Sequence, residues 1–187
     1  MLAQELGGAL GAPATARTDG DHEGSAAQPR QLGDQGVDGQ IDGTVDVRHF
    51  LWMVAEGEGY ELLKVAAHRG LRGLKIAPFY GCQILRPSKL MGFEDPDKPS
   101  SLERISEACG GEAIDYPAKI KCCGFPIIQA REETALAELI QPIEQAMEAG
   151  ADAMVTPCPL CHLSLDAWQS KLRKQTGKDF AMPILHL

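Results

Sequence analysis

Hydrophobic residues in this chain follow two alternating patterns from about residue 70 onward. Short segments rich in apolar residues, typical of buried strands, occur at 74–80, 113–116, 153–156 and 183–187. Between these segments, apolar residues recur at steps of three and four, which predicts helices over 101–108, 132–149 and about 159–175. Two shorter helices are predicted before the first strand, over about 47–57 and 60–68.

The punctuation between these elements supports the predicted limits. Ser100 or Ser101 is a suitable N-cap, and glycines follow the helices at 110 and 150. Residues 91–100 contain two prolines and are predicted to form a loop. In the helix over 60–68, Leu62, Leu63 and Val65 are expected on the apolar side.

Alternating strands and helices predict an α/β fold, with a mostly parallel sheet and flanking helices. Right-handed crossovers would place the carboxyl ends of the strands along one edge of that sheet. Cofactors of open α/β sheets bind at this edge. Residues that directly follow the strands are therefore the first candidates for a functional site.

Composition narrows the class of protein. The chain has 187 residues, 44% of them hydrophobic, with a net charge of −8. That charge argues against a nucleic-acid partner, which requires clustered Lys and Arg, and no apolar run approaches the roughly 20 residues of a membrane span. Residues 1–43 are rich in Gly, Ala, Asp and Gln, so we expect a disordered segment followed by one domain over 44–187.

The first residues lack the positively charged start of a signal peptide, and Glu5 interrupts their apolar stretch. We therefore expect a cytoplasmic chain, associated with a membrane only through partners. Thiols stay reduced in that compartment, so clustered cysteines are interpreted as metal ligands before disulfides.

Five of the six cysteines form the main chemical pattern: Cys82, the adjacent pair Cys122 and Cys123, and the CxxC motif of Cys158 and Cys161. Two of these groups directly follow predicted strands, so we expect them to meet at one sheet edge. Adjacent side chains point apart, which suits two irons better than one metal ion. Five thiolates without a carboxylate cluster favour an iron–sulfur centre.

Other interpretations use fewer of these residues. Structural zinc on four of the five cysteines is the main alternative. The sequence Cys158-Pro-Leu-Cys161-His162 also fits the CxxCH pattern of c-type haem attachment, which requires export and leaves the other cysteines unexplained. A thioredoxin-like CxxC uses only two of the five.

The remaining candidates carry weaker signals. Cys109 is interpreted as a small buried hydrophobic residue. His162 is placed to donate a hydrogen bond to a cluster sulfur, or else to cap a helix or face solvent. His49 and His68 are expected at solvated or core positions.

The cysteines and their neighbours resemble the cysteine-rich CCG domain found in one subunit of heterodisulfide reductase. The resemblance is carried by Phe-Tyr-Gly-Cys82, Lys-Cys122-Cys123-Gly-Phe-Pro and Thr-Pro-Cys158-Pro-Leu-Cys161-His-Leu. Residues 47–51 resemble the stretch that leads into the second such domain of that family. The chain has one motif where the family has two, and so resembles a truncated, frame-shifted or half-length member.

The resemblance implies a function as well as a fold. It implies that Cys82, Cys122, Cys123, Cys158 and Cys161 hold a noncubane [4Fe–4S] cluster in an oxidoreductase subunit. That subunit would pass electrons to a disulfide or related acceptor. The implied partners are a ferredoxin-like cubane iron–sulfur subunit and, in some complexes, a flavin subunit. Two alternatives stay open: a zinc-stabilised docking module without catalysis, and an iron–sulfur subunit of a succinate dehydrogenase or of a lactate, glycolate or glycerol-3-phosphate oxidising complex.

Overall fold

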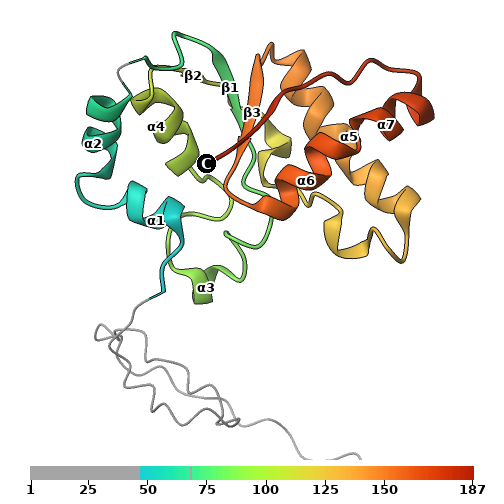
Figure 1. The fold of residues 1–187 in the computed structure, drawn as a ribbon. Helices are drawn as coiled ribbons and strands as arrows, with labels where there is room; N and C mark the ends of the chain where they lie inside the picture. Colours follow the sequence, from blue (N-terminus) through green and yellow to red (C-terminus); the bar gives the residue numbers. More distant parts are fainter. Residues whose placement is uncertain (1–46, 68) are drawn as a thin grey trace, which may run out of the picture. The chain divides into compact units, whose positions relative to one another are not determined.

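The structure, a computed structural model, describes residues 47–67 and 69–187. The expected segment 1–43 and His68 lie outside these residues. Four parallel strands form one sheet in the order β2-β1-β3-β4, with bounds β1 (Lys75–Pro78), β2 (Glu112–Ala113), β3 (Ala153–Thr156) and β4 (Ile184–His186) (Figure 1). The predicted α/β fold with a parallel sheet is confirmed.

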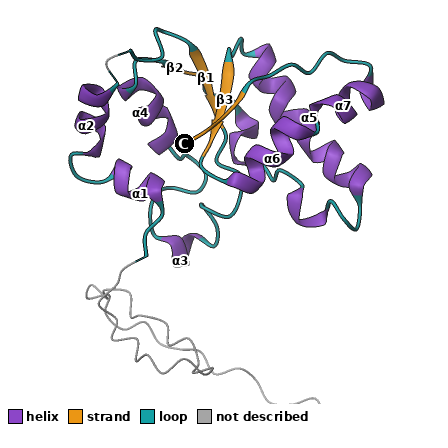
Figure 2. Ribbon diagram, in the orientation of Figure 1, coloured by secondary structure: helices purple, strands orange, loops and turns teal. Residues whose placement is uncertain are grey.

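Helices flank the sheet and connect its strands (Figure 2). The α-helices are α1 (Phe50–Ala55), α2 (Gly59–Ala66), α3 (Ser88–Met91), α4 (Ser101–Ala108), α5 (Glu132–Glu148), α6 (Pro159–Ala167) and α7 (Gln169–Thr176). Two short 3-10 helices, η1 (Pro117–Ile120) and η2 (Phe125–Ile127), lie between β2 and α5. The short helix α3 falls outside the sequence prediction.

Two predicted elements are shorter or divided in the structure. The helix expected over 159–175 is broken at Trp168, which ends α6 and begins α7. The half-buried Trp168 packs against the hydrophobic core, and its ψ of 0° departs from helical geometry. The strand expected over 113–116 ends at Ala113, although the Ile114 N–H still donates to the Ile76 carbonyl at 2.8 Å.

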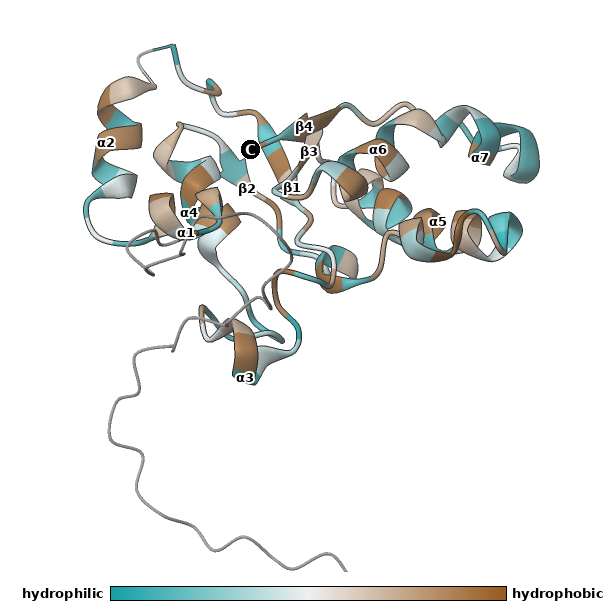
Figure 3. Cartoon of the chain, turned by 60° about the horizontal axis from the view of Figure 1, so that its bottom comes forward, coloured by the Kyte–Doolittle hydropathy of each residue, from teal (hydrophilic) through white to brown (hydrophobic). Residues whose placement is uncertain are grey.

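One face of the sheet packs against α5, α6 and α7. Ala77 of β1 and Met154 of β3 are completely buried there, together with Leu139 of α5 and Leu165 of α6. The α5 residues recur at helical spacing, as the pattern predicts. Figure 3 shows the outer surface of α7 as largely hydrophilic, consistent with a helix at the edge of this core.

The opposite face is covered by α4, against which α1 and α2 pack. Leu51, Leu102 and Ile105 form the centre of this second core. The expected apolar side of α2 is wrong: Leu62 is 66% exposed and Val65 80% exposed. The buried residue is Tyr60, because its ring packs under the Arg104 guanidinium of α4, 4.0 Å from the ring centroid.

Candidate functional site

The segment that follows β1 carries Cys82. The Phe79 N–H donates to the Val155 carbonyl at 2.7 Å and therefore continues the sheet beyond β1. Gly81 then turns the chain with φ +70°, a conformation that favours glycine. A Cβ atom added to Gly81 would lie 2.8 Å from the Cys161 sulfur. Glycine at this position therefore permits the close approach of the first and last cysteine segments.

The second segment carries Cys122 and Cys123 between η1 and η2. Cys122 is half-buried and accepts a hydrogen bond from the Gly124 N–H at 3.3 Å, whereas Cys123 is 4% exposed and belongs to the α5–α6 core. Gly124 has φ +71°, and an added Cβ would lie 2.5 Å from the Ala135 carbonyl oxygen of α5. The cysteine pair is thus fixed against the side of α5.

The third segment joins β3 to α6. Cys158 occupies the N-cap position of α6, and its N–H donates to the Thr156 hydroxyl at 3.4 Å. Cys161 is buried in the first turn of the helix. The amide dipoles of a helix favour negative charge at its N-terminus, so both thiols lie where a thiolate is stabilised.

The three segments meet in one pocket at the carboxyl edge of the sheet. Its volume, including space open to solvent, is about 330 Å³. The pocket is lined by Tyr80, Cys82, Gln83, Ile84, Cys123, Phe125, Pro126, Cys158, Leu160 and Cys161. Four of the five predicted cysteines therefore line it. Cys122 lies outside the lining but forms a hydrogen bond with the Cys82 thiol.

The two buried cysteines are strongly coupled. A hydrogen bond from Cys161 lowers the pKa of Cys123 to about 6, against the opposing effect of burial. The Phe125 N–H and the Ser164 hydroxyl act in the same direction. The pKa of Cys161 is raised, first because its thiol is held protonated by Cys123 and then because it is buried. Cys123 is therefore the thiolate of this pair near neutral pH.

The outer cysteines extend this coupling. Burial raises the pKa of Cys82, and the nearby Cys122 and Cys123 raise it further. Cys158 in turn contributes to the raised pKa of Cys161. All five cysteines consequently belong to one electrostatically linked set, although they come from three distant segments.

The pocket has features that suit an iron–sulfur cluster. The Ser164 hydroxyl of α6 is fully buried beside Cys123, and no group in the described part of the chain completes its hydrogen bonding with good geometry. An unsatisfied buried donor is costly, and a cluster sulfur or thiolate is the kind of acceptor it lacks. Within residues 47–67 and 69–187, no three His, Cys, Asp or Glu side chains are arranged to hold a single metal ion.

A buried polar network connects the first two cysteine segments. The Tyr80 hydroxyl donates to the Glu103 carboxylate of α4 and accepts from the Leu102 N–H at 2.8 Å. Lys119 of η1 pairs with the same carboxylate at 2.5 Å, and its backbone carbonyl accepts from the Tyr80 N–H at 2.8 Å. Burial and the Glu103 charge raise the pKa of Tyr80, which therefore stays neutral. No short motif predicts Glu103, since its partners are distant in sequence.

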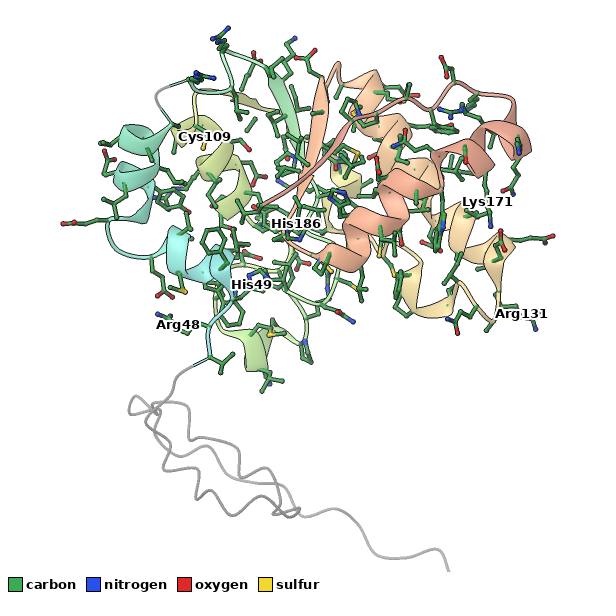
Figure 4. The ribbon with its side chains drawn as sticks, in the orientation of Figure 1. Arg48, His49, Cys109, Arg131, Lys171 and His186 are labelled. Carbon is green, nitrogen blue, oxygen red and sulfur yellow. The ribbon has the colours of Figure 1, made fainter. Side chains whose placement is uncertain are left out.

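The other candidates lie apart from the pocket or border it. Cys109 is the C-cap of α4, half-buried and outside the linked set (Figure 4). His162 has a buried Nδ1 without a partner in the described residues, and its ring lies 5.9 Å from that of His186. His49 is the N-cap of α1, and its Nδ1 accepts from the Leu51 N–H at 3.1 Å.

Comparison with known families agrees with this arrangement. The family model of the CCG cysteine-rich domain matches residues 76–166, from β1 to α6, and so includes all five linked cysteines. This chain carries a CCG cysteine-rich domain. The domain ends within the last turn of α6, which means that α7 and β4 lie beyond the matched residues.

Several curated proteins are similar to the chain over most of its length. The membrane anchor subunit of 8-methylmenaquinol:fumarate reductase from Wolinella succinogenes is 37% identical over 78% of this chain and 50% of its own length. A subunit of the ferredoxin:CoB-CoM heterodisulfide reductase from Methanosarcina mazei is 32% identical over 79% and 49%. A protein from Archaeoglobus profundus that is named as similar to the same reductase subunit is 33% identical over 79% and 51%.

The chain spans about half the length of the curated relatives it matches. No helix in the described residues has the length and apolar character that crossing a membrane requires.

Proposed function

We propose that this chain is an iron–sulfur electron-transfer subunit of an oxidoreductase complex related to heterodisulfide reductase. The observation that carries the proposal is the convergence of five cysteines from three segments on one pocket. In this proposal Cys82, Cys122, Cys123, Cys158 and Cys161 are the cluster ligands. The similarity to the heterodisulfide reductase subunit supports a noncubane [4Fe–4S] type.

The residues around the pocket would support such a cluster in defined ways. Thiolate ligands need stabilisation, which the α6 N-terminus and the Phe125 N–H provide for Cys123 and Cys161. Ser164 would donate to a sulfur of the cluster. Ile84 and Leu160 exclude water from the pocket. When bound, the cluster would supply single-electron transfer between a partner subunit and a disulfide or related acceptor.

Partner subunits form part of this proposal. A cubane iron–sulfur subunit would supply electrons, with a flavin subunit in some complexes. The 37% identity to a fumarate reductase membrane anchor subunit favours a second candidate, an electron-delivering subunit of a succinate- or fumarate-converting complex. Six free thiols suit a reducing compartment, so we propose a cytoplasmic location, with membrane contact made through partners.

Anaerobic reconstitution of the full chain with iron and sulfide tests this function. We expect stoichiometric iron and acid-labile sulfide, a visible absorption band and an electron paramagnetic resonance signal in one redox state. One bound zinc without sulfide would contradict the proposal and support a zinc-stabilised docking module instead.

A further inference from the structure

The mouth of the cysteine pocket opens onto an apolar surface built by η2 and α6. Pro126 and Leu160 line the pocket and are also exposed. Ile127, 39% exposed, and Leu163, 49% exposed, extend this surface beyond the pocket. The two helices lie against each other, so these four residues form one patch, which we call the η2–α6 patch. Exposed apolar patches beside a functional site are typical of interaction surfaces.

The charges next to this patch have one sign. Lys119, Lys121 and Arg131 are the only charged residues between 116 and 131, and residues 153–165 contain no Asp, Glu, Lys or Arg. Lys119 is occupied by its two carboxylate partners. Lys121 and Arg131 are exposed and make no ion pair within the described residues (Figure 4 shows Arg131 directed outward). Two cations available to a partner therefore flank the patch.

This arrangement contrasts with the chain as a whole. A net charge of −8 repels an anionic partner from most directions. The cations beside the η2–α6 patch leave one side from which an acidic protein can approach. Electron transfer weakens steeply with distance, so a partner docked here would have its redox centre close to the pocket. An apolar centre with a charged rim is also the usual anatomy of a protein interface.

We infer that the η2–α6 patch is the docking surface for an acidic iron–sulfur protein that donates electrons to this chain; the inference rests on the proposed function. One electron leaves the reduced cluster of the partner and enters the cluster of this chain. The partner is oxidised, this chain is reduced, and no bond forms or breaks. The small patch predicts a transient complex, as in other electron-transfer pairs.

The test uses the reconstituted full chain and an acidic bacterial [4Fe–4S] ferredoxin as the probe. Calorimetric titration with oxidised ferredoxin measures docking, and stopped-flow mixing with reduced ferredoxin measures electron transfer. In the double variant Ile127→Glu/Leu163→Glu we expect both the affinity and the second-order rate constant to fall by about tenfold or more. Lys121→Glu/Arg131→Glu should lower the rate constant and reduce its dependence on salt.

Matched variants separate docking from other effects. Leu62→Glu/Val65→Glu places two charges on the exposed side of α2, and Lys174→Glu reverses one exposed charge on α7. Both should bind and react like the wild type. Iron, sulfide and the paramagnetic spectrum should be unchanged in every variant, because none of these residues lines the pocket.

Three results would overturn the inference. They are absence of ferredoxin binding to the wild type, equal losses in the patch and α2 variants, and binding of the wild type to anionic lipid vesicles in place of ferredoxin. The last result would assign the patch to a membrane surface. Absence of a cluster in the wild type would instead remove the proposed function, while the calorimetric titration would still decide whether the patch docks an acidic protein.

Discussion

The two faces of the sheet support the cysteine pocket by different means. On the α5–α6 face, Cys123 and Cys161 belong to a continuous apolar core with Leu139 and Leu165. On the α4 face, the segment of Cys82 is positioned by a buried polar network centred on Glu103. The comparison teaches that packing fixes the inner cysteines, whereas charge and hydrogen bonds fix the spacing of the outer ones.

The largest expected effect is the loss of the cluster when a linked cysteine is replaced. Cys123→Ser should abolish the paramagnetic signal and the bound sulfide, because the proposed cluster loses the thiolate at the centre of the linked set. Cys109→Ser, at the C-cap of α4, is the matched control and should retain both. Metal and sulfide analysis after reconstitution measures the difference; a full signal in Cys123→Ser would remove this residue from the ligand set.

Leu139→Ala tests the apolar face. Leu139 is fully buried in α5, and its truncation should lower the free energy of unfolding by about 2–5 kcal/mol through lost burial and a cavity. The control Val65→Ala, at an 80% exposed position of α2, should change it by less than about 0.5 kcal/mol. Urea denaturation of the cluster-free chain provides the measurement, and similar losses in both variants would contradict the assigned cores.

Glu103→Gln tests the polar face. The substitution keeps the shape of the side chain but removes the charge that pairs with Lys119, so we expect a loss of about 1–3 kcal/mol in unfolding free energy. The amount of cluster incorporated should also fall, because Tyr80 and Lys119 would no longer hold the segments of Cys82 and Cys122 together. Asp115→Asn is the control, since Asp115 is 86% exposed and its pair with Lys119 contributes at most about 1 kcal/mol.

The smallest effect concerns the ionisation of Cys123 in the cluster-free chain. Its pKa of about 6 lies below the ordinary value of 9.0, chiefly because of the Cys161 hydrogen bond. The resulting stability should be present above about pH 9 and lost as the pH falls through about 6. Cys161→Ala should move the thiolate titration, followed by ultraviolet absorbance, upward toward 9. An unchanged titration would mean that other groups stabilise the Cys123 thiolate.

Periodicity was sufficient for elements whose pattern reflects a single buried face. The strand over 153–156 and the helix from Glu132 were predicted nearly to their ends, since each has a clear apolar pattern and the helix has a terminating glycine. The buried side of α2 could not be predicted, because it is decided by the contact of Tyr60 with Arg104 on a different helix. The break at Trp168 likewise depends on core packing and leaves no local signal.

The site shows the same division. The convergence of the five cysteines followed from the carboxyl-edge rule for parallel strands, which needs only the order of elements along the chain. The contributions of Ser164, Gly81 and Glu103 required coordinates. Each depends on a close approach between segments that the sequence separates, such as Gly81 to the Cys161 sulfur.

The strand order has a consequence for how the protein is made. The central pair β1 and β3 joins Ile76 to Ala153, which are far apart in the sequence, and such non-local parallel pairing forms slowly. The segments of Cys82 and Cys158 can meet only after that pairing. Cluster assembly must therefore follow the folding of the sheet, and the machinery that delivers iron and sulfide would act on a nearly native chain.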